Sequence, residues 1–179
     1  MEKKILPFYT NYLGQWSRYY MKDPITNQEF NCAEQYMMYT KALLFEDLET
    51  ANSIIDTDDP KEQKALGRIV KRFDKKLWDV YARDIVYSGN YLKFSQNNII
   101  FEKLLATKDS ILVEASPYDL IWGVGIPLTD NNIYDRKNWK GKNWLGEVLT
   151  QLRDDFISGS ASYYTLDWLL NDDSNIKFK

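Results

Sequence analysis

Residues 114–125 read Glu-Ala-Ser-Pro-Tyr-Asp-Leu-Ile-Trp-Gly-Val-Gly, and this stretch is the most informative part of the chain. It turns at Ser116-Pro117 and then places the carboxylate of Asp119 three residues before Trp122. Gly123 and Gly125 follow at once. Glycines beside an indole and an acid indicate a backbone that must approach another group closely. An ordinary core strand rarely has this sequence.

The composition limits the chemistry that the chain can perform. There is no histidine among the 179 residues, so acid–base chemistry must come from carboxylates, lysine, tyrosine or the single Cys32. One cysteine excludes an intramolecular disulfide, and without histidine it excludes zinc held by Cys and His. We therefore expect neither a metal nor a cofactor. The net charge of −3 argues against an extended nucleic-acid-binding surface.

The apolar patterns predict an α+β fold that is mostly helical, as one domain over residues 1–158 with a few short strands. The N-terminus does not read as a signal peptide and no apolar run can span a membrane, so we expect a cytoplasmic protein. Residues 159–179 read as a linker and a short amphipathic tail. Strands are expected at 5–9 and 111–115, and a loop at 127–142. Helices are expected at 32–45, 47–55, from Pro60 to 67 or 70, 75–94, 97–106 and 145–157.

Two pairs of residues are candidates for chemistry. Glu34 and Lys41 lie seven apart on the first predicted helix, so both face one side, about 10 Å apart along its axis. They either flank a ligand or are a capping-box carboxylate, with Asn31 as the N-cap, and a solvated lysine. Asp119 and Trp122 share a side only if their segment turns. The alternative makes Asp119 a turn residue and Trp122 a core anchor.

Other residues are weaker candidates. Glu114 is a third acid beside an apolar strand. The segment 141–146 resembles a helix start whose N–H groups could meet an anion. The basic side chains that could hold a phosphate are Arg18, Arg68, Arg83, Lys93 and Arg153.

Taken together, the motifs resemble the NADAR family, also called YbiA-like N-glycosidases. The resemblance covers about residues 8–156. It rests on the helix motif at 32–42, with its glutamate and lysine seven apart, on Lys-Phe-Ser-Gln-Asn at 93–97, and on the run at 112–125. The Trp-x-Gly-x-Asn-Trp-Leu-Gly motif at 139–146 completes it. Arg18 departs from the pattern, because many relatives have asparagine there.

The resemblance implies cleavage of an N-glycosidic bond between a 5′-phosphorylated ribose and an amino-bearing heterocycle. The implied substrates are phosphoribosylamino-pyrimidine intermediates of riboflavin synthesis. The alternatives are ADP-ribosylated guanine, or a non-catalytic module that binds ADP-ribose or NAD-like ligands. We expect Glu34, Lys41 and Asp119 to be catalytic. Lys41 either binds the 5′-phosphate or donates a proton, or it attacks C1′ of a ring-opened ribosylamine and forms a Schiff base. The expected substrate contacts are Trp122, Arg18, Arg83, Lys93 and Gly123.

Overall fold

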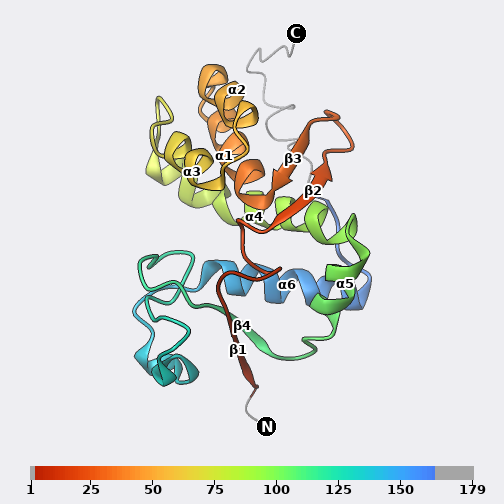
Figure 1. Cartoon of the computed structure of the whole chain (residues 1–179), viewed down its shortest axis with the longest axis vertical. Coiled ribbons are helices and arrows are strands. Elements are labelled where there is room, and N and C mark those ends of the chain that lie inside the picture. The colour runs from red at the N-terminus through yellow and green to blue at the C-terminus, as the bar shows by residue number, and fades with distance from the viewer. Residues whose placement is uncertain (1–2, 164–179) are drawn as a thin grey trace.

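The computed structural model describes residues 3–163. Helices dominate it, and they gather in two groups with α4 between them (Figure 1). The helices are α1 (Ala33–Leu44), α2 (Leu48–Asp56), α3 (Pro60–Arg68), α4 (Lys75–Ser95), α5 (Asn98–Leu105) and α6 (Trp144–Ser158). The strands are β1 (Ile5–Phe8), β2 (Arg18–Lys22), β3 (Glu29–Cys32) and β4 (Ile111–Glu114). Two short 3-10 helices, Asn131–Tyr134 and Arg136–Asn138, interrupt the loop before α6. The mostly helical α+β fold is as the sequence predicts.

Strong local signals fix most helix boundaries. Asp47 caps α2, since its side chain accepts a hydrogen bond from the Thr50 N–H. Pro60 occupies the first turn of α3, where a missing N–H costs nothing. The prediction that Asn31 caps α1 is wrong. The N-cap is Cys32, which makes no side-chain cap bond, and the side-chain amide of Asn31 is bonded instead to Asp58 and Gln63.

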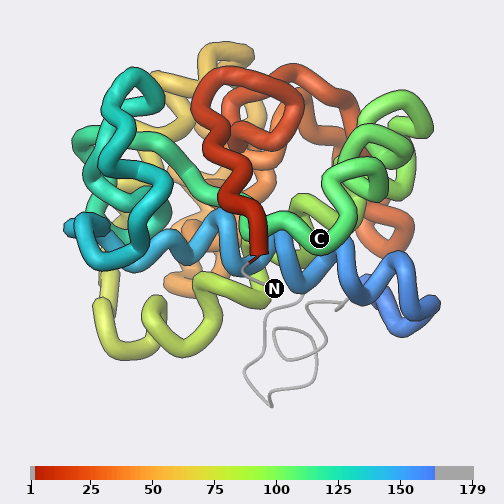
Figure 2. The backbone as a smooth tube through the Cα atoms, turned by 90° about the horizontal axis from the view of Figure 1, so that it is seen from below, coloured from red at the N-terminus to blue at the C-terminus, as the bar shows by residue number. Residues whose placement is uncertain are grey.

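The strands form two separate pairs. β1 and β4 run parallel, with Ile5 opposite Ile111, and lie side by side next to α6 (Figures 1 and 2). β2 and β3 form an antiparallel hairpin that is not among the strands expected from the sequence. Its turn is closed by Asp23, whose carboxylate accepts from the N–H groups of Ile25 and Thr26. Both pairs bring the ends of distant segments to the same region as the start of α1.

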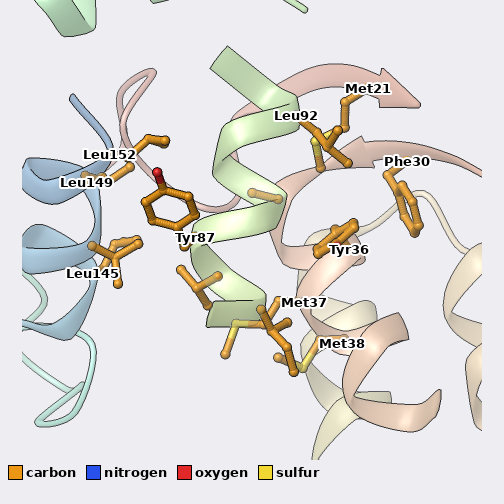
Figure 3. Close-up of a cluster of buried hydrophobic side chains, with 14 of the residues drawn as sticks. Met21, Phe30, Tyr36, Met37, Met38, Tyr87, Leu92, Leu145, Leu149 and Leu152 are labelled. Carbon is orange, nitrogen blue, oxygen red and sulfur yellow. The ribbon is translucent and has the colours of Figure 1, made fainter. Parts of the chain in front are cut away.

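The main core lies on both sides of α4 (Figure 3). Tyr87 of α4 faces the α6 side chains, whereas α1 packs on the opposite side of α4. The leucines from α6 are Leu145, Leu149 and Leu152, and the side chains from α1 are Tyr36, Met37 and Met38. Burial of such apolar surface is the main stabilising contribution, at roughly 25 cal/mol per Å². It holds α1 and α6 at fixed positions relative to each other.

The chain after α6 returns to the body of the domain. The Tyr163 hydroxyl donates to the Asp23 carboxylate at 3.0 Å, and its ring stacks near that of Tyr91. Tyr163 is the last described residue, so the rest of the predicted amphipathic tail lies outside the described residues. Within residues 3–163, no helix is both long and apolar enough to cross a membrane.

The contact between α6 and β4 leaves no room for a side chain at Gly146. A Cβ there would lie 2.1 Å from the Leu112 carbonyl oxygen, which is backbone and cannot move aside cheaply. Replacing a helix glycine by alanine ordinarily stabilises a helix by about 0.5–1 kcal/mol. We expect Gly146→Ala to destabilise the protein instead, by about 1–3 kcal/mol in urea unfolding, because α6 must move off β4. Gln151→Ala, on an exposed position of the same helix, is the control. An unchanged or raised unfolding midpoint for Gly146→Ala would contradict this packing.

Candidate active site

A cavity of about 560 Å³ lies where the loop 9–17, α1, α3 and the segment after β4 meet. This volume is in the usual range for sites that bind small molecules. Its apolar surface comes from Met37, Met38, Trp122 and Leu145, and Trp16 lies at its edge with 47% of its surface exposed. The cavity therefore combines an aromatic wall with the polar groups described below.

Three carboxyl groups line the cavity, and each comes from a different part of the fold. Glu34 lies in the first turn of α1, Glu114 ends β4, and Asp119 follows in the next turn. Glu34 is 4% exposed and Glu114 is 8% exposed, so neither is the solvated carboxylate that a capping box would present. Glu34 and Asp119, two of the three side chains expected to be catalytic, thus line the same cavity.

Burial controls the protonation of Glu34. Its pKa is raised to about 7, chiefly by removal from water, and the nearby charge of Asp119 acts in the same direction. The cation of Lys64, a hydrogen bond from the Trp16 side chain and the cation of Arg68 oppose this rise. Glu34 is therefore present in both its acid and its base form near neutral pH, which suits a group that transfers protons.

Asp119 has two different contacts. Its Oδ1 accepts from the backbone N–H groups of Ile121 and Trp122, at 3.0 and 2.8 Å. Its Oδ2 lies 3.9 Å from the Nζ of Lys64. The segment therefore turns, and the turn that Asp119 closes also sets the position of the Trp122 backbone.

Two cations of α3 line the cavity, one helical turn apart. Arg68 was among the phosphate candidates, whereas Lys64 was missed. Their spacing of four residues places both on one face of the helix, and this is the signal that would have found Lys64. Lys64 also lies 5.9 Å from the centre of the Trp16 ring. No hydrogen bond or ion pair of the Arg68 guanidinium is present within residues 3–163.

Lys41 is not among the residues that line the cavity. Its Nζ donates to the Gly67 carbonyl oxygen at 2.6 Å and lies 4.3 Å from the centre of the Phe73 ring. Burial lowers the pKa of the Lys41 amine. Lys41 and Glu34 do share a side of α1. Lys41 lies two turns further along the helix, however, so its amine reaches the end of α3 and not the cavity.

Of the predicted contact residues, Trp122 lines the cavity, whereas the basic side chains proposed for the phosphate, apart from Arg68, lie outside its lining. Arg18 donates to the Asp58 carbonyl oxygen at 2.8 Å, and Arg83 pairs with Glu147 at 3.0 Å. Lys93 is fully buried and donates to the Gly14 carbonyl oxygen at 2.9 Å, behind the loop that forms one cavity wall. Burial lowers the pKa of Lys93 to about 7. Arg153, also buried, donates to the Ser110 carbonyl oxygen.

Gly123 is held by close packing. A Cβ at this position would lie 2.9 Å from the Ser116 Cβ and 3.0 Å from the Glu114 carbonyl oxygen. The Gly123 backbone thus approaches the chain on both sides of the Ser116 turn. The close approach predicted for this glycine occurs with the protein's own backbone.

The backbone N–H groups of residues 141–145 are already used within the protein. The amides of Lys142, Asn143, Trp144 and Leu145 all donate to carbonyl oxygens of residues 120–123. The expectation of an anion site at this helix start is therefore wrong. Nor do residues 3–163 contain a group of three or more Cys, Asp or Glu side chains arranged to hold a metal ion.

The fold and site are those of a small α+β domain with a carboxylate-lined cavity. The chain belongs to the NADAR domain family, whose model matches residues 7–157. It is 43% identical over 129 residues to Protein irg-1 of Caenorhabditis elegans, a match that covers 71% of this chain and 61% of that protein. It is 41% identical over 145 residues to N-glycosidase R617 of Acanthamoeba polyphaga mimivirus, covering 79% of this chain and 85% of the relative.

The NMR structure of the E. coli protein YbiA has the same fold, with a TM-score of 0.71. The superposition covers 92% of this chain and 93% of YbiA at 23% sequence identity. The predicted family and the predicted YbiA-like fold are thereby confirmed.

The hydrogen bond between Trp16 and Glu34 generates a prediction about protonation. Because the Trp16 bond stabilises the carboxylate, Trp16→Phe should raise the pKa of Glu34 above its value of about 7. A titration of ¹³C-labelled glutamate carboxyls by NMR measures this shift. Trp139→Phe is the control, since the Trp139 indole donates to the Ile133 carbonyl oxygen. A Glu34 titration that is unchanged or shifted down in Trp16→Phe would count against the bond.

Proposed function

We propose that this protein is an N-glycosidase that cleaves the C1′–N bond between a phosphorylated ribose and a flat, amino-bearing heterocycle. One observation supports this most: Glu34, Glu114 and Asp119 converge with Lys64 and Arg68 in one aromatic-walled cavity. The name of the relative R617, N-glycosidase, agrees with this chemistry.

The carboxyl groups suit the charges that develop during the reaction. Breaking a C1′–N bond places positive charge on the sugar and negative charge on the departing nitrogen. A carboxylate at Asp119 stabilises the sugar cation, because Lys64 and two backbone N–H groups hold it in place. Glu34, with a pKa of about 7, transfers the proton that water or the leaving group requires. Trp122 forms a wall for the sugar or the base.

The phosphate is assigned to Arg68. Its guanidinium lines the cavity without an ion pair in the described part of the chain, and its planar fork matches phosphate oxygens. This assignment replaces the expected phosphate contacts at Arg83 and Lys93, whose cations are held by Glu147 and the Gly14 carbonyl oxygen.

Two routes to hydrolysis fit the cavity. In the first, water activated by a carboxylate attacks C1′ directly. In the second, a lysine amine attacks C1′ of the ring-opened ribosylamine, expels the amino heterocycle and forms an imine that water then hydrolyses. Lys64 is the amine in position for the second route, since its side chain lines the cavity and that of Lys41 does not.

Within this class of ribosylated heterocycles, the substrate that we propose first is a phosphoribosylamino-pyrimidine of the riboflavin pathway. ADP-ribosylated guanine is the second candidate, favoured by the open rim of the cavity. There Tyr9 and Trp16 are 41% and 47% exposed, which leaves surface against which a larger substrate can stack.

The first test is release of the free base. The protein is incubated with the phosphoribosylamino-pyrimidine and, separately, with ADP-ribosylated guanosine. We expect turnover of at least one of them, and a loss of roughly 10²-fold in kcat for Glu34→Gln. The matched control is Glu102→Gln, an exposed position on α5. ADP-ribose binding by calorimetry without turnover of either substrate would favour the non-catalytic module instead.

The second test separates the two routes. Borohydride reduces a lysine imine to a stable adduct, which mass spectrometry locates. If the imine route operates, the label should fall on Lys64, and Lys64→Arg should abolish it while Lys41→Arg leaves it in place. A label on Lys41 would contradict the geometry, and the absence of any adduct under turnover would favour direct attack by water.

A further inference from the structure

The proposed chemistry leaves the carboxyl group of Glu114 without a role. Glu114 lines the cavity at the end of β4 and is only 8% exposed. Its Oε2 is buried, and no residue in the range 3–163 forms a hydrogen bond with it. A buried polar atom without a partner is costly and uncommon in a native structure. Such an atom beside a cavity indicates that a ligand supplies the missing partner.

The backbone of Glu114 is firmly held, so its side chain has a fixed origin. The Glu114 N–H donates to the Asn143 side chain at 2.9 Å, and its carbonyl oxygen accepts from the Val124 N–H at 3.0 Å. Only the terminal torsion of the carboxyl group turns broadly, which allows either oxygen to meet a ligand.

The surroundings keep this carboxyl group uncharged near neutral pH. Burial raises the pKa of Glu114 to about 8, and the charge of Asp119 in the following turn acts in the same direction. The amines of Lys64 on α3 and Lys93 on α4 face it, and their charged forms oppose the rise. An uncharged carboxyl group has one O–H donor and one carbonyl acceptor side by side.

We propose that Glu114 is the specificity-determining residue of this cavity and that it binds the cyclic amide edge of the leaving heterocycle. A cyclic amide presents an N–H next to a C=O, which is the complement of an uncharged carboxyl group. The inference rests on the proposed function for the identity of the ligand as a ribosylated heterocycle. Guanine and aminopyrimidinones both carry this edge.

The same geometry explains how a wrong base is rejected. A heterocycle without the N–H and C=O pair leaves the buried carboxyl group of Glu114 unsatisfied, and polar sites built in this way discriminate strongly. A different role, in which Glu114 protonates the departing nitrogen, would require a proton that can be given up. Glutamine has the donor and acceptor of an uncharged carboxyl group but cannot give up a proton, so it separates the two roles.

Binding measurements test the inference without any need for turnover. The probes are guanosine 5′-monophosphate and 2-aminopurine riboside 5′-monophosphate, which lacks the cyclic amide edge. At about pH 6.5 the wild-type protein should bind the first at least about tenfold more tightly by calorimetry. This preference should weaken as the pH rises through about 8, because the carboxylate of Glu114 can still accept from the ring N–H but has no donor for the C=O.

Two variants complete the test. Glu114→Gln should keep the preference at both low and high pH, and it also reports any ionisation of the nucleotide itself. Glu114→Ala should lose the preference at every pH. A wild-type protein without the preference, whether it binds both probes equally or neither, overturns the inference. So does a Glu114→Gln variant that discriminates no better than Glu114→Ala.

The inference and the proposed function can fail separately. Release of free base by a protein that shows no preference between the probes would remove the role of Glu114 alone. A clear preference in a protein that hydrolyses neither candidate substrate would remove the N-glycosidase assignment alone.

Discussion

The structure depends on a row of backbone hydrogen bonds that joins two irregular segments. The amides of Lys142, Asn143, Trp144 and Leu145 donate to carbonyl oxygens of residues 120–123, and two further amides share the Val124 carbonyl. Residues 120–123 lie outside every helix and strand, and the donor segment reaches only into the first turn of α6, so these bonds take the place of regular secondary structure. At Gly141 a Cβ would lie 2.2 Å from the Gly123 carbonyl oxygen, which makes the close approach specific to glycine. The turn with Asp119 and Trp122 and the start of α6 are therefore fixed together.

The site contains ionisable carboxyl groups that are buried, where the charged form is unfavourable. Glu34 and Glu114 are nearly removed from water, and their pKa values rise to about 7 and about 8. Two buried acids near a third would repel one another if all were ionised, and the cations of α3 only partly offset this. Protonation of Glu34 and Glu114 reduces this repulsion between carboxylates at neutral pH. A chain without histidine thus obtains groups that exchange protons in the range where imidazole usually acts.

Local chemistry made most of the helices predictable, whereas long-range contacts did not follow from it. Asp47 and Pro60 mark helix starts by their own bonding, so no tertiary information was needed. The β2 and β3 hairpin was missed. The positions of β2 alternate between exposed and more buried, but an aromatic residue, Tyr20, occupies an exposed position and hides the pattern, and β3 buries three residues in a row. The family motifs led us to expect Glu34, Lys41, Asp119 and Trp122 in one site, and the cavity is lined by all of these except Lys41. Lys64 was not predicted as a cavity residue because it belongs to none of the family motifs, although its four-residue spacing from Arg68 was visible in the sequence.

The location of Lys41 shows how a residue outside the cavity can still shape it. Its amine binds the Gly67 carbonyl oxygen in the last turn of α3, where a cation also interacts favourably with the helix dipole. A Cβ at Gly67 would meet the Met38 side chain, so α1 and α3 touch closely at this point. Lys64 and Arg68 lie in the same helix as this contact. The first helix thus supplies Glu34 to the cavity directly, and through Lys41 and Met38 it sets the position of the cations that face Glu34.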